Sequence, residues 1–182
     1  EVIIVNTCGF IESAKKESID TILEMARHKA GGKCKQLIVT RCLAERYSQE
    51  LLDEIPEIDH LLGVGQYPQL KTIIADVDPL SKNHVATPAE YYESYTDRLL
   101  TTAFYTAYLK ISEGCSNRCA FCIIPKIRTT LRSKTIHDTV TEATRLVELG
   151  HKEIVLTGIF IGAYGHETAL RRKQQGSKGD HL

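Results

Sequence analysis

The sequence predicts an α/β protein whose strands run parallel and form two successive units. Short apolar runs alternate with longer segments in which apolar residues recur at helical spacing. The runs are apolar throughout, which is typical of strands that are buried on both faces of a parallel sheet. A stretch without clean periodicity, residues 78–104, separates the two units, and we expect it to be an interdomain linker.

The first unit, residues 1–77, shows three apolar runs followed by helical patterns. Gly31 and Gly32 predict the end of the first helix, and Pro56 the end of the second. Helix and strand alternate, which favours an open parallel α/β sheet. The expected elements are strands at 2–5, 36–40 and 60–64, and helices at about 11–30, at 44–54 and from Pro68 onward.

Two cysteines follow the predicted strands of this unit directly. Cys8 and Cys42 therefore lie at carboxyl ends of strands, where ligands bind in open α/β sheets. On their position alone, such a pair is more often buried in the core than bound to a metal. Cys34 follows Gly31-Gly32-Lys33 in a predicted loop, and we interpret it as a free thiol.

The second unit, residues 105–182, begins with a predicted strand at 107–112 that leads into a cysteine-rich loop. A helical pattern ends at Gly150, and the apolar stretch "EIVLTGIFIGAYG" predicts a second strand. This is a second β-loop-α-β unit, and no partner strand follows it. The barrel or sheet that begins here is therefore not completed within the sequence.

The cysteine-rich loop, "ISEGCSNRCAFCIIP", holds Cys115, Cys119 and Cys122. Thiolates are soft ligands that suit iron–sulfur clusters, zinc and Cu(I). Zinc usually takes four protein ligands in two separated pairs, and ferredoxin-type runs supply four cysteines. Three cysteines leave one iron of a four-iron cluster open, which favours a cluster with a vacant iron over a zinc site.

Composition restricts the class of protein. Lys and Arg balance Asp and Glu, so no strongly basic nucleic-acid surface is indicated, although a local patch is compatible with zero net charge. No apolar run approaches the roughly 20 residues of a membrane span, and no signal peptide opens the chain, which predicts a cytoplasmic protein without membrane contact. In that compartment six cysteines are more often ligands or reactive thiols than disulfides. The chain starts at Glu1 inside a predicted strand, and we interpret it as part of a longer polypeptide.

The cysteine spacing resembles that of the radical S-adenosylmethionine superfamily. The strings "NTCGFIESAKKES", "CLAERY", "AYLKISEGC" and "CAFCIIPKIR" are similar, in their order, to those of the methylthiotransferase family. The closest resemblance is to the branch that modifies an aspartate of a small-subunit ribosomal protein; sister branches modify adenosine derivatives in transfer RNA. The resemblance implies an amino-terminal α/β domain followed by the start of a radical S-adenosylmethionine partial (β/α) barrel.

The resemblance also implies cofactors and partners. Family members use two 4Fe–4S clusters and S-adenosylmethionine, with a flavodoxin- or ferredoxin-type reductant and a ribosomal protein or, alternatively, transfer RNA as substrate. No catalytic residue is implied beyond the cluster ligands. The implied site residues are Cys115, Cys119 and Cys122 for the first cluster, Cys8 and Cys42 for the second, Phe121 beside the adenine, and Thr157 and Gly158 near the methionine moiety.

Four features depart from the family pattern. The third cysteine of the second cluster would lie before Glu1. Arg41 replaces a small residue, and Thr129 stands where the family has glycine, so a positive φ there would be strained. "LTGIFIGAYG" resembles the transfer-RNA branches more than the ribosomal-protein branch. A transfer-RNA methylthiotransferase and a cluster-binding module without turnover are therefore the alternatives.

Overall fold

The structure is a computed structural model that describes residues 1–75, 82–86, 100–101 and 103–167. The chain divides into two compact units, Glu1–Tyr91 and Tyr92–Leu182, and each is described by itself. The predicted domain boundaries at 77 and 105 stay a prediction. The prolines and tyrosines of the predicted linker lie outside the described residues.

The first unit is an open parallel α/β sheet, as the sequence predicts. Its strands are β1 (Val2–Thr7), β2 (Gln36–Arg41) and β3 (His60–Leu62), in the order β1-β2-β3. Both strand pairs are parallel, with Thr7 opposite Arg41 and Ile38 opposite His60. The helices are α1 (Glu12–Gly31), α2 (Cys42–Arg46), α3 (Ser48–Glu54) and α4 (Leu70–Ala75), with a 3₁₀ turn, η1, at Tyr67–Gln69.

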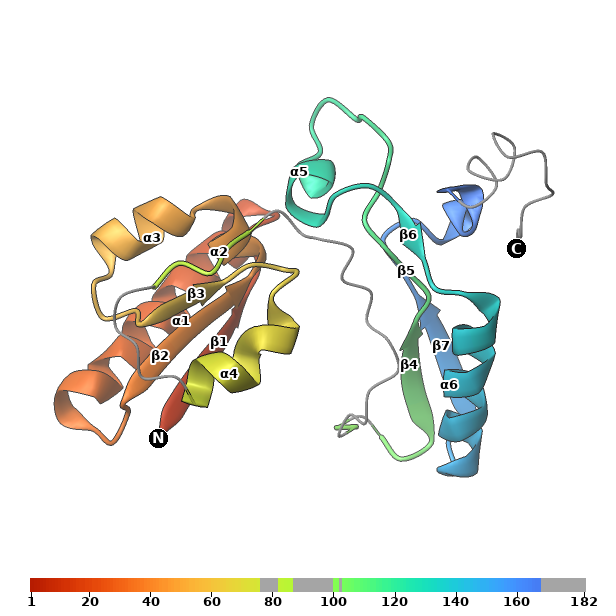
Figure 1. Ribbon diagram of the computed structural model, residues 1–182, viewed down its shortest axis with the longest axis horizontal. Helices are drawn as coiled ribbons and strands as arrows, with labels where there is room; N and C mark the ends of the chain where they lie inside the picture. The colour runs from red at the N-terminus through yellow and green to blue at the C-terminus, as the bar shows by residue number, and fades with distance from the viewer. Residues whose placement is uncertain (76–81, 87–99, 102, 168–182) are drawn as a thin grey trace. The chain divides into compact units, whose positions relative to one another are not determined.

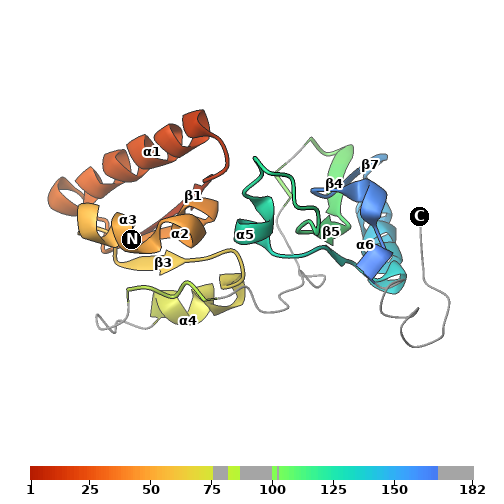
Figure 2. The same cartoon turned by 90° about the horizontal axis from the view of Figure 1, so that it is seen from above.

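The core of this unit lies on both faces of β2. Leu37 and Val39 pack with Ile22 of α1, whereas Ile38 packs with Ile73 of α4. Figure 2 shows α1 and α4 on opposite sides of the sheet. The uninterrupted apolar run of β2 is explained by this arrangement, since residues pointing to either face meet a helix.

Two details differ from the prediction. The single helix expected at 44–54 is broken at Tyr47, which has φ −132° and ψ 38° and separates α2 from α3. Residues 82–86, inside the predicted linker, extend the sheet beyond β3. The amide of Leu61 donates to the Lys82 carbonyl at 2.7 Å, and the amide of His84 donates to the Leu61 carbonyl at 2.9 Å. Asn83 therefore forms a parallel bridge with Leu61.

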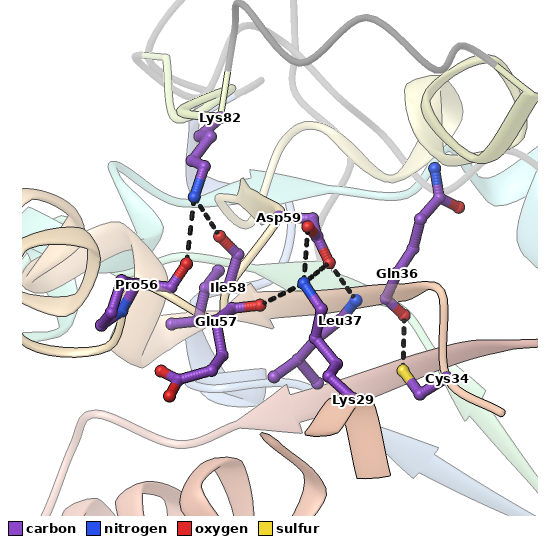
Figure 3. A network of polar contacts seen from close by, with 9 residues as sticks. All are labelled: Lys29, Cys34, Gln36, Leu37, Pro56, Glu57, Ile58, Asp59 and Lys82. Carbon is purple, nitrogen blue, oxygen red and sulfur yellow. Dashed lines mark hydrogen bonds and ion pairs between the residues drawn. The ribbon is translucent and has the colours of Figure 1, made fainter. Parts of the chain in front are cut away.

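A polar network fixes the amino-terminal ends of β2 and β3 (Figure 3). The Lys29 ammonium donates to both carboxylate oxygens of Asp59 at 2.7 Å and to the Glu57 carbonyl at 2.8 Å. Asp59 also accepts the amide of Leu37 at 2.7 Å. Lys82 donates to the carbonyls of the Pro56–Ile58 turn. The network therefore joins α1, β2 and the loop before β3.

The second unit contains a parallel β-α-β arrangement, also as predicted. Strands β4 (Thr106–Lys110) and β7 (Glu153–Thr157) pair in parallel, and α6 (Ile136–Glu148) connects them in sequence (Figure 1). Ala107, Leu109 and Ile111 pack against Leu146 and Tyr164. The described residues of this unit form no closed barrel.

The prediction missed a small antiparallel pair in this unit. Strand β5 (Ser112–Glu113) pairs with β6 (Arg132–Ser133), and the short helix α5 (Ile124–Arg128) lies between them in sequence. After β7 comes the 3₁₀ turn η2, Ile161–Ala163, and the described residues continue to Glu167. Across the described ranges of both units, no helix has the length and apolar character that crossing a membrane requires.

Candidate functional site

The loop with three cysteines is closed at its base by contacts of the backbone. The amide of Cys115 donates to the Thr129 carbonyl at 3.1 Å, and the amide of Leu131 donates to the Ser116 hydroxyl oxygen at 3.1 Å. Gly114 has φ +73°, and a Cβ atom there would lie 2.2 Å from the Thr130 carbonyl oxygen. Only glycine fits this close approach, so the base of the loop depends on Gly114.

The carboxylate of Glu113 connects the two sides of this base. It accepts from the Lys110 ammonium at 2.8 Å and from Nη1 of Arg128 at 3.2 Å. Its other oxygen accepts the amide of Gly114 at 3.2 Å. Burial tends to raise the pKa of Glu113, but the charges of Lys110 and Arg128 and the hydrogen bonds outweigh burial and hold the pKa below its ordinary value. Glu113 is therefore ionised at neutral pH.

The three cysteines themselves lie in a segment, residues 114–123, that contains no helix or strand. Cys119 is exposed, and Cys115 and Cys122 are half-buried. A turn brings the amide of Cys122 to the Cys119 carbonyl at 3.0 Å. The donor set fits a cluster because one loop supplies three accessible thiols. Within the described parts of the chain, no three His, Cys, Asp or Glu side chains form a ready metal site. Ligation by these cysteines therefore stays a prediction.

The residues expected around S-adenosylmethionine come from the cysteine loop and from the end of β7. Phe121 is 92% exposed between two of the cysteines. Thr157 and Gly158 follow β7, where the Thr157 carbonyl accepts the amide of Ile111 at 2.9 Å. A Cβ atom at Gly158 would lie 2.3 Å from Oγ of Ser112. Gly158 is thus packed tightly on β5, and the roles of these three residues stay predictions.

In the first unit, the backbone brings the segments of Cys8 and Cys42 together. Each residue directly follows one of the paired residues Thr7 and Arg41. A Cβ atom at Gly9 would lie 2.7 Å from the Cys42 carbonyl oxygen, and Arg46 donates to the Gly9 carbonyl at 3.0 Å. The sequence prediction that each cysteine follows the carboxyl end of a strand agrees with this geometry, and the structure adds that the two strands are neighbours. Cys8 is exposed and Cys42 is buried.

Arg41 has an unusual backbone conformation beside this pair of cysteines. Its φ of 78° and ψ of −146° belong to a region that glycine occupies and other residues avoid. Nε of Arg41 donates to the Tyr67 hydroxyl at 3.0 Å, and the guanidinium carbon lies 4.8 Å from the centre of the Tyr67 ring. The sequence showed that Arg41 replaces a small residue, but it gave no sign of the contact with Tyr67.

Cys34 is separated from these cysteines by the length of a strand. It precedes β2, whereas Cys42 follows it, and six residues of strand span about 20 Å at roughly 3.3 Å per residue. Its Sγ donates to the Gln36 carbonyl at 3.3 Å, and the side chain is buried. Cys34 therefore does not contribute to the pair formed by Cys8 and Cys42. All six cysteines lie in the described ranges, and none forms a disulfide.

Comparison with known proteins shows what the chain is similar to. Residues 1–63 match the model of a family described as "Uncharacterized protein family UPF0004". The chain is 47% identical over 167 residues to "Ribosomal protein uS12 methylthiotransferase RimO" of Anaeromyxobacter sp. (strain Fw109-5), covering 92% of this chain and 35% of the relative. Proteins of the same name from Myxococcus xanthus (strain DK1622) and Clostridium novyi (strain NT) are 47% and 48% identical over 173 and 170 residues, which cover 95% and 92% of this chain and 36% and 38% of the relatives.

The chain thus spans little more than a third of the length of these relatives. The matched region includes most of the chain, well beyond the 63 residues of the family model. The resemblance that the sequence motifs indicated is confirmed: over most of its own length the chain is similar to these proteins, which are named as methylthiotransferases.

Proposed function

We propose that the protein is a radical S-adenosylmethionine methylthiotransferase that modifies an aspartate of a small-subunit ribosomal protein. The observation that carries the proposal is the loop of Cys115, Cys119 and Cys122, whose base is fixed by backbone contacts while its three thiols stay accessible. Support for the substrate class comes from the relatives, which are named as uS12 methylthiotransferases.

In this proposal the three thiolates of the loop hold a 4Fe–4S cluster. Such a cluster, when bound, supplies the electron for reductive cleavage of S-adenosylmethionine at its open iron. The exposed ring of Phe121 is available to stack on the adenine, since every base offers a π-face. Thr157 and Gly158 follow β7 in the same unit, and we assign them to the methionine moiety.

Cys8 and Cys42 would contribute two thiolates to a second 4Fe–4S cluster that carries the sulfur. Their segments follow neighbouring parallel strands, and the contact of Gly9 with the Cys42 carbonyl holds those segments close together. Exposure of Cys8 leaves that thiol accessible to an incoming cluster. A flavodoxin- or ferredoxin-type protein in the cytoplasm is the proposed reductant.

The catalytic part of the proposal is tested on the full-length protein after anaerobic reconstitution with iron and sulfide. We expect a reductant to produce 5′-deoxyadenosine from S-adenosylmethionine, and Cys122→Ala to abolish the product. Cys34→Ala is the matched control, because Cys34 is a buried thiol at the opposite end of β2 from Cys42. Absence of 5′-deoxyadenosine would leave a cluster-binding module without turnover. Equal activity of Cys122→Ala would show that Cys122 does not hold the cluster that cleaves S-adenosylmethionine.

The substrate is tested by mass spectrometry of ribosomal proteins and transfer RNA from a strain that lacks the full-length gene. We expect the methylthio group to disappear from the ribosomal protein and to remain on transfer RNA. Loss from transfer RNA alone would contradict the proposal and favour the alternative that the "LTGIFIGAYG" string suggests.

A further inference from the structure

The segment that carries the three cysteines has no regular structure to hold its shape. Residues 114–123 contain no helix or strand, so ordering them around one inorganic centre costs conformational entropy. That cost is smaller when the ends of the segment are already held at a fixed separation. The contacts at those ends therefore influence how firmly the thiols bind a cluster.

Glu113 makes contacts on both sides of this segment. Lys110, at the end of β4, reaches its carboxylate from before the loop, and Arg128, the last residue of α5, reaches it from after the loop. The side chains of Glu113 and Arg128 are only 16% and 17% exposed. An ion pair that is so little exposed has a more fixed geometry than a pair on the surface.

The two hydrogen bonds of the backbone at the loop base do not reach α5, whereas the Glu113 carboxylate does. The Cys115 amide reaches Thr129, and the Leu131 amide reaches Ser116, so both bonds involve residues after α5. The Glu113–Arg128 contact is a side-chain bridge from β5 to α5 itself, the helix that follows Cys122 closely. It therefore restrains the carboxyl-terminal end of the cysteine segment.

We propose that Glu113 is a positioning residue for the cluster of Cys115, Cys119 and Cys122: its bridge to Lys110, Arg128 and the Gly114 amide holds the ends of the cysteine segment at the separation that lets all three thiols bind one cluster. This inference rests on the proposed function. Residues that orient ligands without touching the metal typically change its affinity by roughly ten- to a hundredfold.

The test uses the full-length protein with Cys8→Ala and Cys42→Ala as the parent, so that only the loop cluster is observed. After anaerobic reconstitution, we measure iron content and the rate at which an iron chelator bleaches the cluster absorbance. We expect Glu113→Gln to lose its cluster about ten- to a hundredfold faster than the parent. Arg128→Met, at the other end of the bridge, should lose it faster as well.

The Glu113→Gln and Arg128→Met effects should be less than multiplicative in the double variant, because both variants weaken the contact between Glu113 and Arg128. Glu142→Gln is the matched control. Glu142 forms a buried ion pair with Lys134 in the same unit but outside the cysteine loop, so this variant lowers stability and should leave the bleaching rate unchanged. Circular dichroism confirms that each variant is folded.

The outcomes separate this inference from the function on which it rests. A parent that binds no iron would overturn both. A parent that binds a cluster, together with a Glu113→Gln or Arg128→Met variant that loses it at the parent rate, would overturn the inference alone. Equal acceleration by Glu142→Gln would also overturn it, because the effect would then reflect general destabilisation of the unit.

Discussion

Nε of Arg41 lies 3.0 Å from the hydroxyl oxygen of Tyr67, and the guanidinium covers the face of the same ring. These contacts hold a residue whose backbone occupies a region of φ and ψ that favours glycine. Such conformations cost of order 1–3 kcal/mol and persist only where surrounding contacts impose them. Strain is therefore present directly beside Cys42.

Replacing Arg41 by glycine should relieve that strain. We expect Arg41→Gly to raise the free energy of unfolding by about 1 kcal/mol, because the relief exceeds both the lost contact with Tyr67 and the greater freedom of glycine in the unfolded chain. Urea unfolding measures the change. Arg41→Ala is the control, since alanine keeps the strain and loses the contact. A lower stability of Arg41→Gly would mean that the Tyr67 contact outweighs the strain.

The ion pair of Lys29 and Asp59 should contribute to the stability of the first unit. Asp59→Asn weakens two short charge-assisted contacts with Lys29 and the contact with the Leu37 amide. We expect a loss of about 1–3 kcal/mol in urea unfolding. Lys15→Met, whose partner Glu12 is 88% exposed, is the control and should lose much less, because exposed ion pairs contribute little to stability. Equal losses of stability in Asp59→Asn and Lys15→Met would show that the contacts of Asp59 stabilise the protein no more than an exposed ion pair does.

Gly114 should tolerate no side chain. Both Gly114 and Gly150 have positive φ, but only Gly114 faces carbonyl oxygens at the position of a Cβ atom, and nothing lies within 4 Å of that position at Gly150. We expect Gly150→Ala to cost about 1 kcal/mol from backbone strain and Gly114→Ala to cost about 2 kcal/mol more from the clash. Thermal unfolding of both variants measures the difference. Equal costs would contradict the close approach at the loop base.

The cysteines of the cluster-free protein should differ in reactivity according to their exposure. Cys8 and Cys119 are exposed, whereas Cys34 and Cys42 are buried. We expect brief treatment with N-ethylmaleimide to label Cys8 and Cys119 first and to label the buried pair only after denaturation. Peptide mass spectrometry identifies the labelled residues. Early labelling of Cys34 would contradict its burial beside Gln36.

The parts of the fold that were predictable are those with a strong apolar pattern. β2 and α6 follow from buried runs and helical spacing, and the placement of Cys8 and Cys42 follows from parallel strands that end together. The pair β5–β6 has two residues in each strand, which is too short to show any periodicity. The bridge at Asn83 depends on a partner strand far away in sequence, and local patterns contain no information on it.

The candidate site likewise combines features that the sequence predicts with features that only the structure shows. Spacing alone indicated the three-cysteine loop, because the residues that define it are adjacent in sequence. The Glu113–Arg128 bridge and the conformation of Arg41 depend on contacts between separate elements, so they became visible only in the structure. The family pattern marked positions 41 and 129 as unusual, and both have positive φ in the structure, the conformation in which strain is expected at Thr129 from the sequence.

A glycine next to a cysteine makes a close backbone approach at both cysteine sites: Gly9 against the Cys42 carbonyl, and Gly114 against the Thr130 carbonyl. Neither approach leaves room for a Cβ atom, so any larger residue would displace the main chain beside Cys8 or Cys115. Protein engineers who wish to retune such a site would therefore have to keep both glycines before they change any ligand.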